Sequence, residues 1–287
     1  MNKQRLKQLL IGDFTWQRMV KSLIFIYLFF AIYVFFRADS MIFQPQPSSY
    51  QDSQEIIKLT NADKTRLAAI HLVNPTAKYT ILYAHGNAED LGDIRAILED
   101  LRDFGFSVFA YDYRGYGTSE GTPSEKNAYQ DIDTAYNYLS QELKIPPQQI
   151  ILFGRSVGGG SVVDLATRRP VGGLIVESTF ISAFRVVVPF AILPFDKFSN
   201  LEKIKKVPCP VLVMHGKVDE VIPFWHGEKL FAAVRSAQSA TAKLSPKLSL
   251  WVEGANHNDF ADVAGKRYGD VLREFTELVD KNQTNIL

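Results

Sequence analysis

Gly154-Arg155-Ser156-Val157-Gly158 is the stretch that decides the fold of this 287-residue chain. It matches the pattern G-x-S-x-G, and it stands between an apolar run at 150–153 and a second apolar segment at 159–166. The first run predicts a buried strand and the second a helix. Strand, G-x-S-x-G and helix together are typical of a nucleophile elbow, a tight turn that lifts a serine hydroxyl out of the backbone. The alternative is a serine in an ordinary glycine-rich turn.

Predicted strands and helices alternate on both sides of this stretch. Strands are expected at 56–59, 67–72, 80–84, 108–111, 150–153, 174–176, 211–214 and 248–252. Helices are expected at 93–104, 128–143, 159–166, 224–235 and 260–281, and an exposed loop at 236–247. The first two strands flank a turn and predict an antiparallel hairpin. This order predicts an α/β fold, in which a mostly parallel sheet of about eight strands carries helices on both faces.

The composition excludes some classes of function. The chain has 32 Lys and Arg residues against 31 Asp and Glu residues, and its main body has no basic or acidic block. We therefore expect no nucleic-acid partner. Cys209 is the only cysteine, which excludes an intramolecular disulfide and zinc sites of the cysteine-rich kind.

An uncharged apolar run at 22–36 stands between Lys21 and Arg37, and residues before it extend the apolar span to 19–36. A cleaved signal peptide needs small residues at its cleavage site, whereas 35–37 holds two phenylalanines and an arginine. An amphipathic surface helix needs a polar face, which this run lacks. The sequence therefore predicts one uncleaved transmembrane helix.

This helix sets the expected organisation of the chain. Residues 1–38 are predicted as a membrane anchor, 39–52 as a linker containing prolines and serines, and 53–287 as the catalytic domain. Basic residues precede the span, namely Lys3, Arg5, Lys7, Arg18 and Lys21. Because positive charge favours the cytoplasmic side, we expect a cytoplasmic N-terminus and a body on the outer face, periplasmic in a diderm bacterium.

A serine hydroxyl needs an adjacent base, usually histidine, before it is a good nucleophile. In a sheet of this kind the order along the chain is serine, acid, histidine, which leaves His226 and His257 as candidates. His257 lies in a loop after the last predicted strand, where parallel sheets place their chemistry. His226 lies inside a predicted helix and is expected to be a surface or capping residue. We therefore predict His257 as the base.

The acid should also follow a strand, and Asp219 does so in the stretch 215–223. Its role would be to orient the imidazole and to stabilise the charged ring. Its neighbour Glu220 and, more seriously, Glu177 at the end of its own strand are the competitors. Asp112 is expected to be a turn partner of Arg114 instead.

The stretch 85–88 follows an earlier strand and leads into a helix. A backbone N–H of Asn87 or Ala88, together with that of Val157, would form an oxyanion hole. The alternative is a plain strand-to-helix turn. His85 is expected to brace this turn rather than to transfer protons.

From about residue 79 to 260 the chain resembles the α/β-hydrolase fold, and more narrowly the membrane-associated protein depalmitoylases and their bacterial and fungal relatives. The stretches that carry the resemblance are 85–92, 111–117, 123–127, 154–158, 215–222 and 251–258. The resemblance implies Ser156, Asp219 and His257 as a catalytic triad. It also implies a serine hydrolase that acts on acyl esters or thioesters and uses no metal or cofactor.

The chain departs from this family in three places. Arg155 precedes the serine where the animal depalmitoylases have glutamine, and the N-terminus has an apolar run in place of a cluster of lipidated cysteines. The loop at 236–247 is an addition. The resemblance therefore supports the catalytic class, whereas S-acylated proteins do not follow from it as substrates.

The apolar stretch 179–194 lies between a core strand and the strand that precedes Asp219. It is either a wall for an acyl chain near Ser156 or a core helix broken by Pro189, and apolar periodicity does not separate the two. The leading hypothesis is a membrane-anchored hydrolase of a small-molecule or lipid-like acyl ester or thioester, with an acylated protein as a further candidate substrate. The alternatives are a serine aminopeptidase-like amide hydrolase and a non-catalytic, membrane-tethered binding module.

Overall fold

The structure is a computed structural model that describes residues 15–234 and 245–284. The chain divides into two compact units, 1–41 and 42–287. The strands are β1 Ile57–Thr60, β2 Arg66–Leu72, β3 Thr80–Ala84, β4 Ser107–Tyr111, β5 Ile150–Arg155, β6 Gly173–Glu177, β7 Val211–Gly216 and β8 Lys247–Val252. The α-helices are α2 Trp16–Ile42, α3 Arg95–Asp103, α4 Glu125–Asn137, α5 Gly158–Arg168, α6 Ala183–Val187, α7 Asn200–Ile204, α8 Trp225–Ala233, α9 Phe260–Ala264 and α10 Lys266–Thr284.

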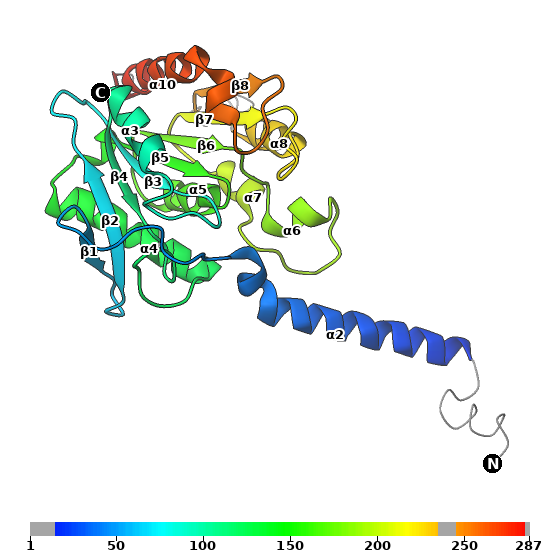
Figure 1. Ribbon diagram of the computed structural model, residues 1–287. Coiled ribbons are helices and arrows are strands. Elements are labelled where there is room, and N and C mark those ends of the chain that lie inside the picture. The colour runs from blue at the N-terminus through cyan, green and yellow to red at the C-terminus, as the bar shows by residue number, and fades with distance from the viewer. Residues whose placement is uncertain (1–14, 235–244, 285–287) are drawn as a thin grey trace. The chain divides into compact units, whose positions relative to one another are not determined.

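The second unit contains an eight-stranded sheet in the order β1-β2-β4-β3-β5-β6-β7-β8 (Figure 1). β1 pairs antiparallel with β2, and β2 pairs antiparallel with β4. All remaining pairs, from β4 to β8, are parallel. The predicted fold class, including the opening hairpin, is confirmed. Because the parallel strands share one direction, their carboxyl ends meet at one edge of the sheet, where the loops of the candidate site lie.

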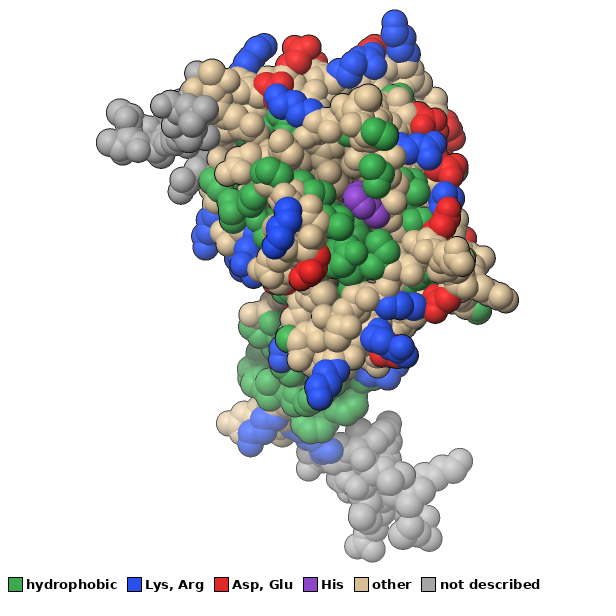
Figure 2. All heavy atoms as spheres, turned by 90° about the vertical axis from the view of Figure 1, so that its left-hand side faces the viewer, with side chains coloured by type: hydrophobic (Ala, Val, Ile, Leu, Met, Phe, Trp, Pro, Cys, Tyr) green, Lys and Arg blue, Asp and Glu red, His purple; other side chains and the backbone are tan. Residues whose placement is uncertain are grey.

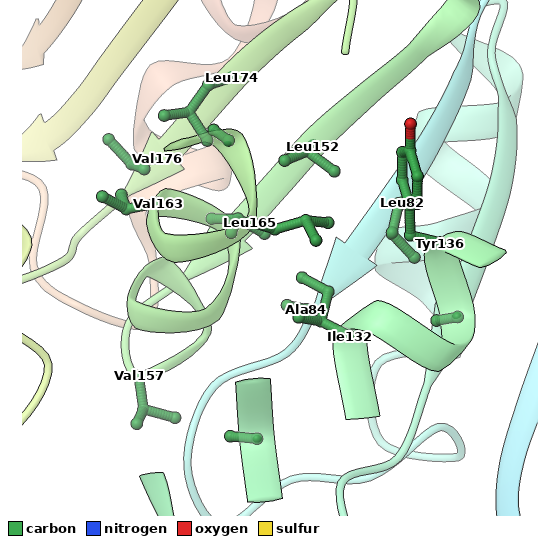
Figure 3. Close-up of a cluster of buried hydrophobic side chains, with 14 of the residues drawn as sticks. Leu82, Ala84, Ile132, Tyr136, Leu152, Val157, Val163, Leu165, Leu174 and Val176 are labelled. Carbon is green, nitrogen blue, oxygen red and sulfur yellow. The ribbon is translucent and has the colours of Figure 1, made fainter. Parts of the chain in front are cut away.

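The two faces of the sheet bury separate apolar cores. Side chains alternate along each strand, so Leu152 of β5 points to one face while Ile151 and Phe153 point to the other. On the first face, α4, α5 and α8 cover the sheet, and Figure 3 shows Leu152 beside Leu165 of α5. This packing fixes α5, and therefore the start of α5 at the elbow, against the centre of the sheet.

On the second face, α3, α9 and α10 cover the sheet. Phe275 of α10 is fully buried there, and its ring lies against Gly173 at the amino end of β6. The predicted helix at 260–281 is divided at Gly265, whose φ of 53° is a left-handed conformation that interrupts the helix. The predicted helix at 128–143 begins three residues earlier, at Glu125, because Ser124 Oγ accepts a hydrogen bond from the Asn127 N–H over 3.1 Å.

Helix α2 belongs to the first unit except for its last residue. Its 27 residues correspond to a length of about 40 Å at about 1.5 Å per residue. The mean hydropathy of its most apolar 18-residue window is 2.2. Within residues 15–234 and 245–284, it is the one helix whose length and composition suit it to crossing a membrane, a test that a signal sequence also passes.

The stretch 179–194 is not the core helix that was one of its two predicted forms. Phe180 and Ile181 are buried, but the helix that follows, α6, is a short one that ends at Val187. Val187 is 84% exposed and Phe190 65% exposed, so the chain from Val187 onward packs against little. Ala183 and Val186 of α6 still pack, half-buried, against the first core, so the core-helix interpretation is wrong only from Val187 onward. The predicted loop at 236–247 lies largely outside the described residues.

The surface carries charges of both signs. On the face that Figure 2 shows, Lys and Arg side chains are interspersed with Asp and Glu side chains around an apolar area that contains a histidine. This face has no large patch of a single sign, in line with the near balance of charges in the sequence.

Candidate active site

Ser156 lies in the turn between the end of β5 and the start of α5, and its φ is 53°. A non-glycine residue rarely adopts this left-handed conformation, and such strain clusters at functional sites. The turn is held by two hydrogen bonds, from the Ser156 N–H to the Glu177 carbonyl (2.9 Å) and from Thr179 Oγ1 to the Ser156 carbonyl (2.6 Å). The predicted strand, turn and helix around the serine are all present.

The glycines of the motif are required by close backbone approach. A Cβ atom on Gly158 would overlap the carbonyl oxygen of Ala84 in β3. A Cβ atom on Gly154 would lie 2.7 Å from the backbone of Gly158, which is closer than such atoms come. The turn is therefore packed so tightly against the sheet that only hydrogen fits at these two positions.

His257 connects Ser156 to Asp219. Its Nε2 lies 3.1 Å from Ser156 Oγ, and its Nδ1 lies 2.8 Å from Asp219 Oδ2. All three residues are largely buried, with between 6% and 8% of their surfaces exposed. The three residues come from loops at the carboxyl ends of β5, β7 and β8. The geometry is that of a nucleophile, a base and an orienting acid in hydrogen-bond reach of one another.

Asp219 is held in its ionised form. Its Oδ1 accepts hydrogen bonds from the N–H groups of Val221 (2.9 Å) and Ile222 (2.7 Å). Burial raises the pKa of Asp219, but hydrogen bonds from His215 and His257 outweigh it and bring the pKa below its ordinary value. The carboxylate therefore carries its charge at neutral pH and can stabilise a protonated His257.

The other candidate base, His226, is fully buried, so its prediction as a surface residue is wrong. Its Nδ1 accepts a hydrogen bond from the Ile181 N–H over 3.1 Å, and its ring stacks on Trp225. Burial lowers the pKa of His226 to about 4, so the ring is neutral. It braces the start of the segment 181–194. His215, also fully buried, lies 3.3 Å from Asp219 Oδ2 through its Nε2.

The competing acids have other partners. Glu177 accepts a hydrogen bond from Tyr268 (2.9 Å) and lies 3.6 Å from Arg155 Nε. Burial raises its pKa, although Arg155 and Tyr268 act in the opposite direction. Glu220 is exposed. Neither forms the hydrogen bond to His257 that Asp219 forms.

The predicted pairing of Asp112 with Arg114 is wrong. Asp112 is fully buried and accepts hydrogen bonds from Tyr50 (2.5 Å) and from the Leu91 N–H (2.9 Å). Arg114 instead pairs with Asp131 (2.9 Å) and with Asp63. The two side chains point apart: that of Arg114 reaches Asp131 on α4, whereas that of Asp112 faces Leu91 in the loop that follows β3.

In the sequence, Arg155 stands out only because the animal depalmitoylases have glutamine at this position. Its guanidinium contacts three separate parts of the site. Nη1 donates to both carboxylate oxygens of Glu89 (3.0 and 2.9 Å), and Nη2 donates to the His257 carbonyl (3.1 Å) and to Asn258 Oδ1 (2.8 Å). The signal in the sequence was a basic residue beside the nucleophile in a strand that is otherwise apolar. Arg155 ties the loop of His257 to the loop after β3.

The loop after β3 has free backbone donors. Among the hydrogen bonds of the described residues, none uses the N–H groups of Asn87, Ala88 or Val157. Ala88 has a φ of 59°, and His85 Nδ1 lies 2.8 Å from the Gly86 carbonyl, so His85 braces this turn as predicted. Unpaired N–H groups beside a nucleophile are the donors that an oxyanion hole needs. In the described part of the chain, no group of three or more His, Cys, Asp or Glu residues is arranged to hold a metal ion.

Comparison with known proteins identifies the family. Residues 75–201 match the family described as "Serine aminopeptidase, S33", and residues 192–281 match the "Prolyl oligopeptidase family". The α/β-hydrolase domain-containing protein 17B of Xenopus tropicalis is 38% identical over 243 residues, which cover 83% of this chain and 80% of that protein. The chain belongs to the α/β-hydrolase family.

Further similarities agree with this family. The α/β-hydrolase domain-containing protein 17C of Mus musculus is 40% identical over 228 residues, which cover 78% of this chain and 68% of that protein. The esterase Pf2001 of Pyrococcus furiosus has a similar structure, with a TM-score of 0.66 and 18% identity over 82% of this chain and 98% of that one. This last likeness shows the fold alone. The resemblance predicted from the sequence is confirmed at the level of the family.

Proposed function

We propose that this α/β hydrolase is a membrane-anchored serine hydrolase that cleaves acyl esters or thioesters through a seryl acyl-enzyme. The observation that carries the proposal is the chain of two hydrogen bonds from Ser156 through His257 to Asp219, at 3.1 and 2.8 Å. It starts at a serine held in a left-handed turn. A structural serine needs neither the strained turn nor a buried histidine and carboxylate in line with its hydroxyl.

In this mechanism Ser156 Oγ attacks the carbonyl carbon of the substrate while His257 Nε2 takes the hydroxyl proton. Asp219 stabilises the resulting imidazolium. The carbonyl oxygen becomes an oxyanion, which the N–H of Val157 and that of Asn87 or Ala88 would hold; each such donor typically contributes about 2.7–4 kcal/mol. The carbon–oxygen or carbon–sulfur bond then breaks, and His257 gives the proton to the departing alkoxide or thiolate. Water then attacks the acyl-serine while His257 Nε2 takes one of its protons; the bond between the acyl carbon and Ser156 Oγ breaks, His257 returns the proton to that oxygen, and the carboxylic acid leaves.

Apolar side chains beside the site support an acyl substrate. Phe180 and Ile181 directly follow Thr179, which hydrogen-bonds to the Ser156 carbonyl. The exposed residues Val187, Phe190 and Ile192 continue this apolar segment. Each methylene that such side chains cover contributes about 0.8 kcal/mol to binding. We therefore propose a small-molecule or lipid-like acyl ester or thioester as substrate, with acylated proteins as a further candidate class.

Helix α2 supports membrane attachment by its length and hydropathy. We propose that it forms a single-pass anchor with a cytoplasmic N-terminus, because the basic residues of the chain's start precede it. The body would then lie on the outer face. Protease added to intact spheroplasts should digest the body, whereas inside-out vesicles should protect it, and the reverse pattern would overturn the orientation.

The Ser156→Ala variant tests the chemistry. A fluorophosphonate probe should label the full-length wild-type protein in detergent and should not label Ser156→Ala, because the probe forms its bond with the nucleophilic oxygen. Labelling that persists in the variant would overturn the assignment of Ser156. A folded wild-type protein that is neither labelled nor active on any ester would instead support a binding module without catalysis.

Amide hydrolysis is the second candidate, since residues 75–201 match the serine aminopeptidase family. The same three residues can cleave an amide, and the leaving amine needs the proton of His257 more than a thiolate does. Comparing kcat/KM on p-nitrophenyl esters, acyl thioesters and aminoacyl anilides separates the two functions. Turnover of anilides above that of both ester classes would favour the aminopeptidase-like activity.

A further inference from the structure

We propose that residues 42–50, named here the strap, position the backbone donors of the oxyanion hole. The strap starts at the last residue of α2 and lies within residues 39–52, which the sequence pattern predicts to be a linker. This inference rests on the proposed function, because it concerns the N–H groups of Asn87 and Ala88. Tyr116 and Phe43 act as positioning residues, which shape the site through Asn87 without touching the substrate.

Phe43 attaches the first part of the strap to the body. Its side chain is 3% exposed and lies among aromatic rings. The ring centroids of Tyr113, Tyr116 and Phe198 lie 6.3, 6.5 and 5.9 Å from that of Phe43. A linker without structure would not bury a phenylalanine in this way. The strap therefore packs against the body from its first residue, Ile42, onward.

The side chain of Asn87 bonds to the strap through both its amide nitrogen and its amide oxygen. Its Nδ2 donates to the Ile42 carbonyl (2.7 Å), and its Oδ1 accepts from the Gln44 N–H (3.0 Å) and from the Tyr116 hydroxyl (2.6 Å). The same Tyr116 oxygen lies 3.0 Å from the Gln44 nitrogen. These bonds leave the Asn87 side chain little freedom to rotate or to shift. Because the backbone N–H and this side chain belong to one residue, the bonds that hold the side chain also restrict the N–H.

The second end of the strap holds the other end of the same loop. Ser49 donates to Asp90 from its backbone N–H (2.8 Å) and from its hydroxyl. Tyr50 donates to Asp112, which in turn accepts from the Leu91 N–H. The residues from Asn87 to Asp90 are thus fixed at both ends by the strap. Ala88, with its left-handed φ of 59°, lies between these two points.

A loop held in this way keeps its N–H groups aimed without help from the substrate. Preorganised donors are effective because they need no reorganisation when charge develops on the substrate oxygen. A misplacement of about 1 Å in a catalytic group can cost about 100-fold in rate. Loosening the strap should therefore reduce kcat more than KM, because the oxyanion exists only in the transition state.

Two pairs of full-length variants test this inference, each with a control of the same chemistry. Tyr116→Phe removes one hydroxyl that bonds to Asn87. Its control is Tyr136→Phe on α4, which removes a half-buried hydroxyl that donates to the Pro170 carbonyl (2.8 Å). Phe43→Leu replaces the aromatic ring that packs the strap against the body with a smaller side chain. Its control is Phe275→Leu, which trims a fully buried ring of the other core, at the amino end of β6.

We expect Tyr116→Phe and Phe43→Leu to lower kcat, and the rate of fluorophosphonate labelling, by about 10-fold with KM within about twofold. The controls should lower the thermal midpoint to a similar degree and leave kcat within about twofold. Values of kcat near wild type in both strap variants would overturn the inference, as would equal losses in variants and controls. Absence of labelling in wild type and in Tyr136→Phe would overturn the proposed function instead.

Discussion

Arg155 donates a hydrogen bond from Nη2 to the backbone carbonyl of His257 over 3.1 Å. The residue directly before the candidate nucleophile thus holds the loop that carries the candidate base. A second nitrogen, Nη1, donates to both oxygens of Glu89, whose Oε1 also accepts from the Gly86 N–H (2.5 Å). A single buried guanidinium therefore links the candidate nucleophile, the candidate base and the loop after β3.

The Arg155→Lys variant should lose activity while it remains folded. A lysine keeps the charge that Glu89 and Glu177 need, but its single nitrogen does not reach both loops. We expect kcat to fall by about 10-fold and the thermal midpoint to fall by only a few degrees. The control is Arg114→Lys, which weakens an equally buried arginine away from the site. Equal loss of kcat in the two variants would contradict a special role for Arg155.

The Gly158→Ala variant should be strongly destabilised. Its Cβ would overlap the Ala84 carbonyl, and this oxygen belongs to a central strand that has no room to move. Such overpacking costs about 1–3 kcal/mol or more. Gly254→Ala is the comparison, because its Cβ meets open space and only its φ of 73° is unfavourable. Chemical denaturation in detergent should rank Gly158→Ala below Gly254→Ala, and the opposite order would contradict the packing argument.

The stability of the protein should depend on pH through Asp112. Burial raises the pKa of Asp112 from 3.8 to about 8, with a smaller contribution from Asp90, against the hydrogen bonds from Tyr50 and Leu91. The folded state thus keeps a proton that the unfolded state releases. The free energy of unfolding therefore falls as pH rises from about 4 to about 8.

Asparagine does not titrate, so the Asp112→Asn variant should lack the part of the fall in unfolding free energy with pH that Asp112 causes. The thermal midpoint of the variant, relative to wild type, should rise by more than about 2 °C between pH 5 and pH 8. Asp52→Asn is the control, because the pKa of this exposed carboxyl is lowered by its hydrogen bond from Lys58, and its charge is constant over this range. A midpoint difference for Asp112→Asn that does not change with pH would show that Asp112 is ionised in the folded state.

Phe29→Arg should weaken membrane attachment. Phe29 lies at the middle of α2, where an arginine costs about 2.5–3.5 kcal/mol for insertion. We expect the variant to be partly released from membranes by alkaline carbonate, whereas wild type and the apolar control Phe29→Leu stay in the pellet. Equal retention of all three proteins would show that α2 is not the anchor.

Much of the site was accessible from the sequence because its signals are local or follow chain order. The elbow needs a strand, two glycines and a helix next to one another, and Ser156, Asp219 and His257 each follow a recognisable strand. Two of the errors concern contacts between distant segments. His226 was misplaced because burial of α8 against residues 180–181 has no local signal. Asp112 was paired with Arg114 because they are neighbours, whereas the fold sends the two side chains to different partners.

The sequence by itself determined the class of fold, the position of the elbow and the apolar helix near the N-terminus, since periodicity and spacing are properties of short segments. Only the tertiary structure decided that Arg155 joins three loops, that Gly265 divides the last helix, and that residues 42–50 are packed against the loop of Asn87. These features depend on hydrogen bonds and burial between segments more than 40 residues apart, or on one backbone torsion. The local sequence of a polar or proline-rich stretch does not indicate which distant residues it contacts in the folded protein.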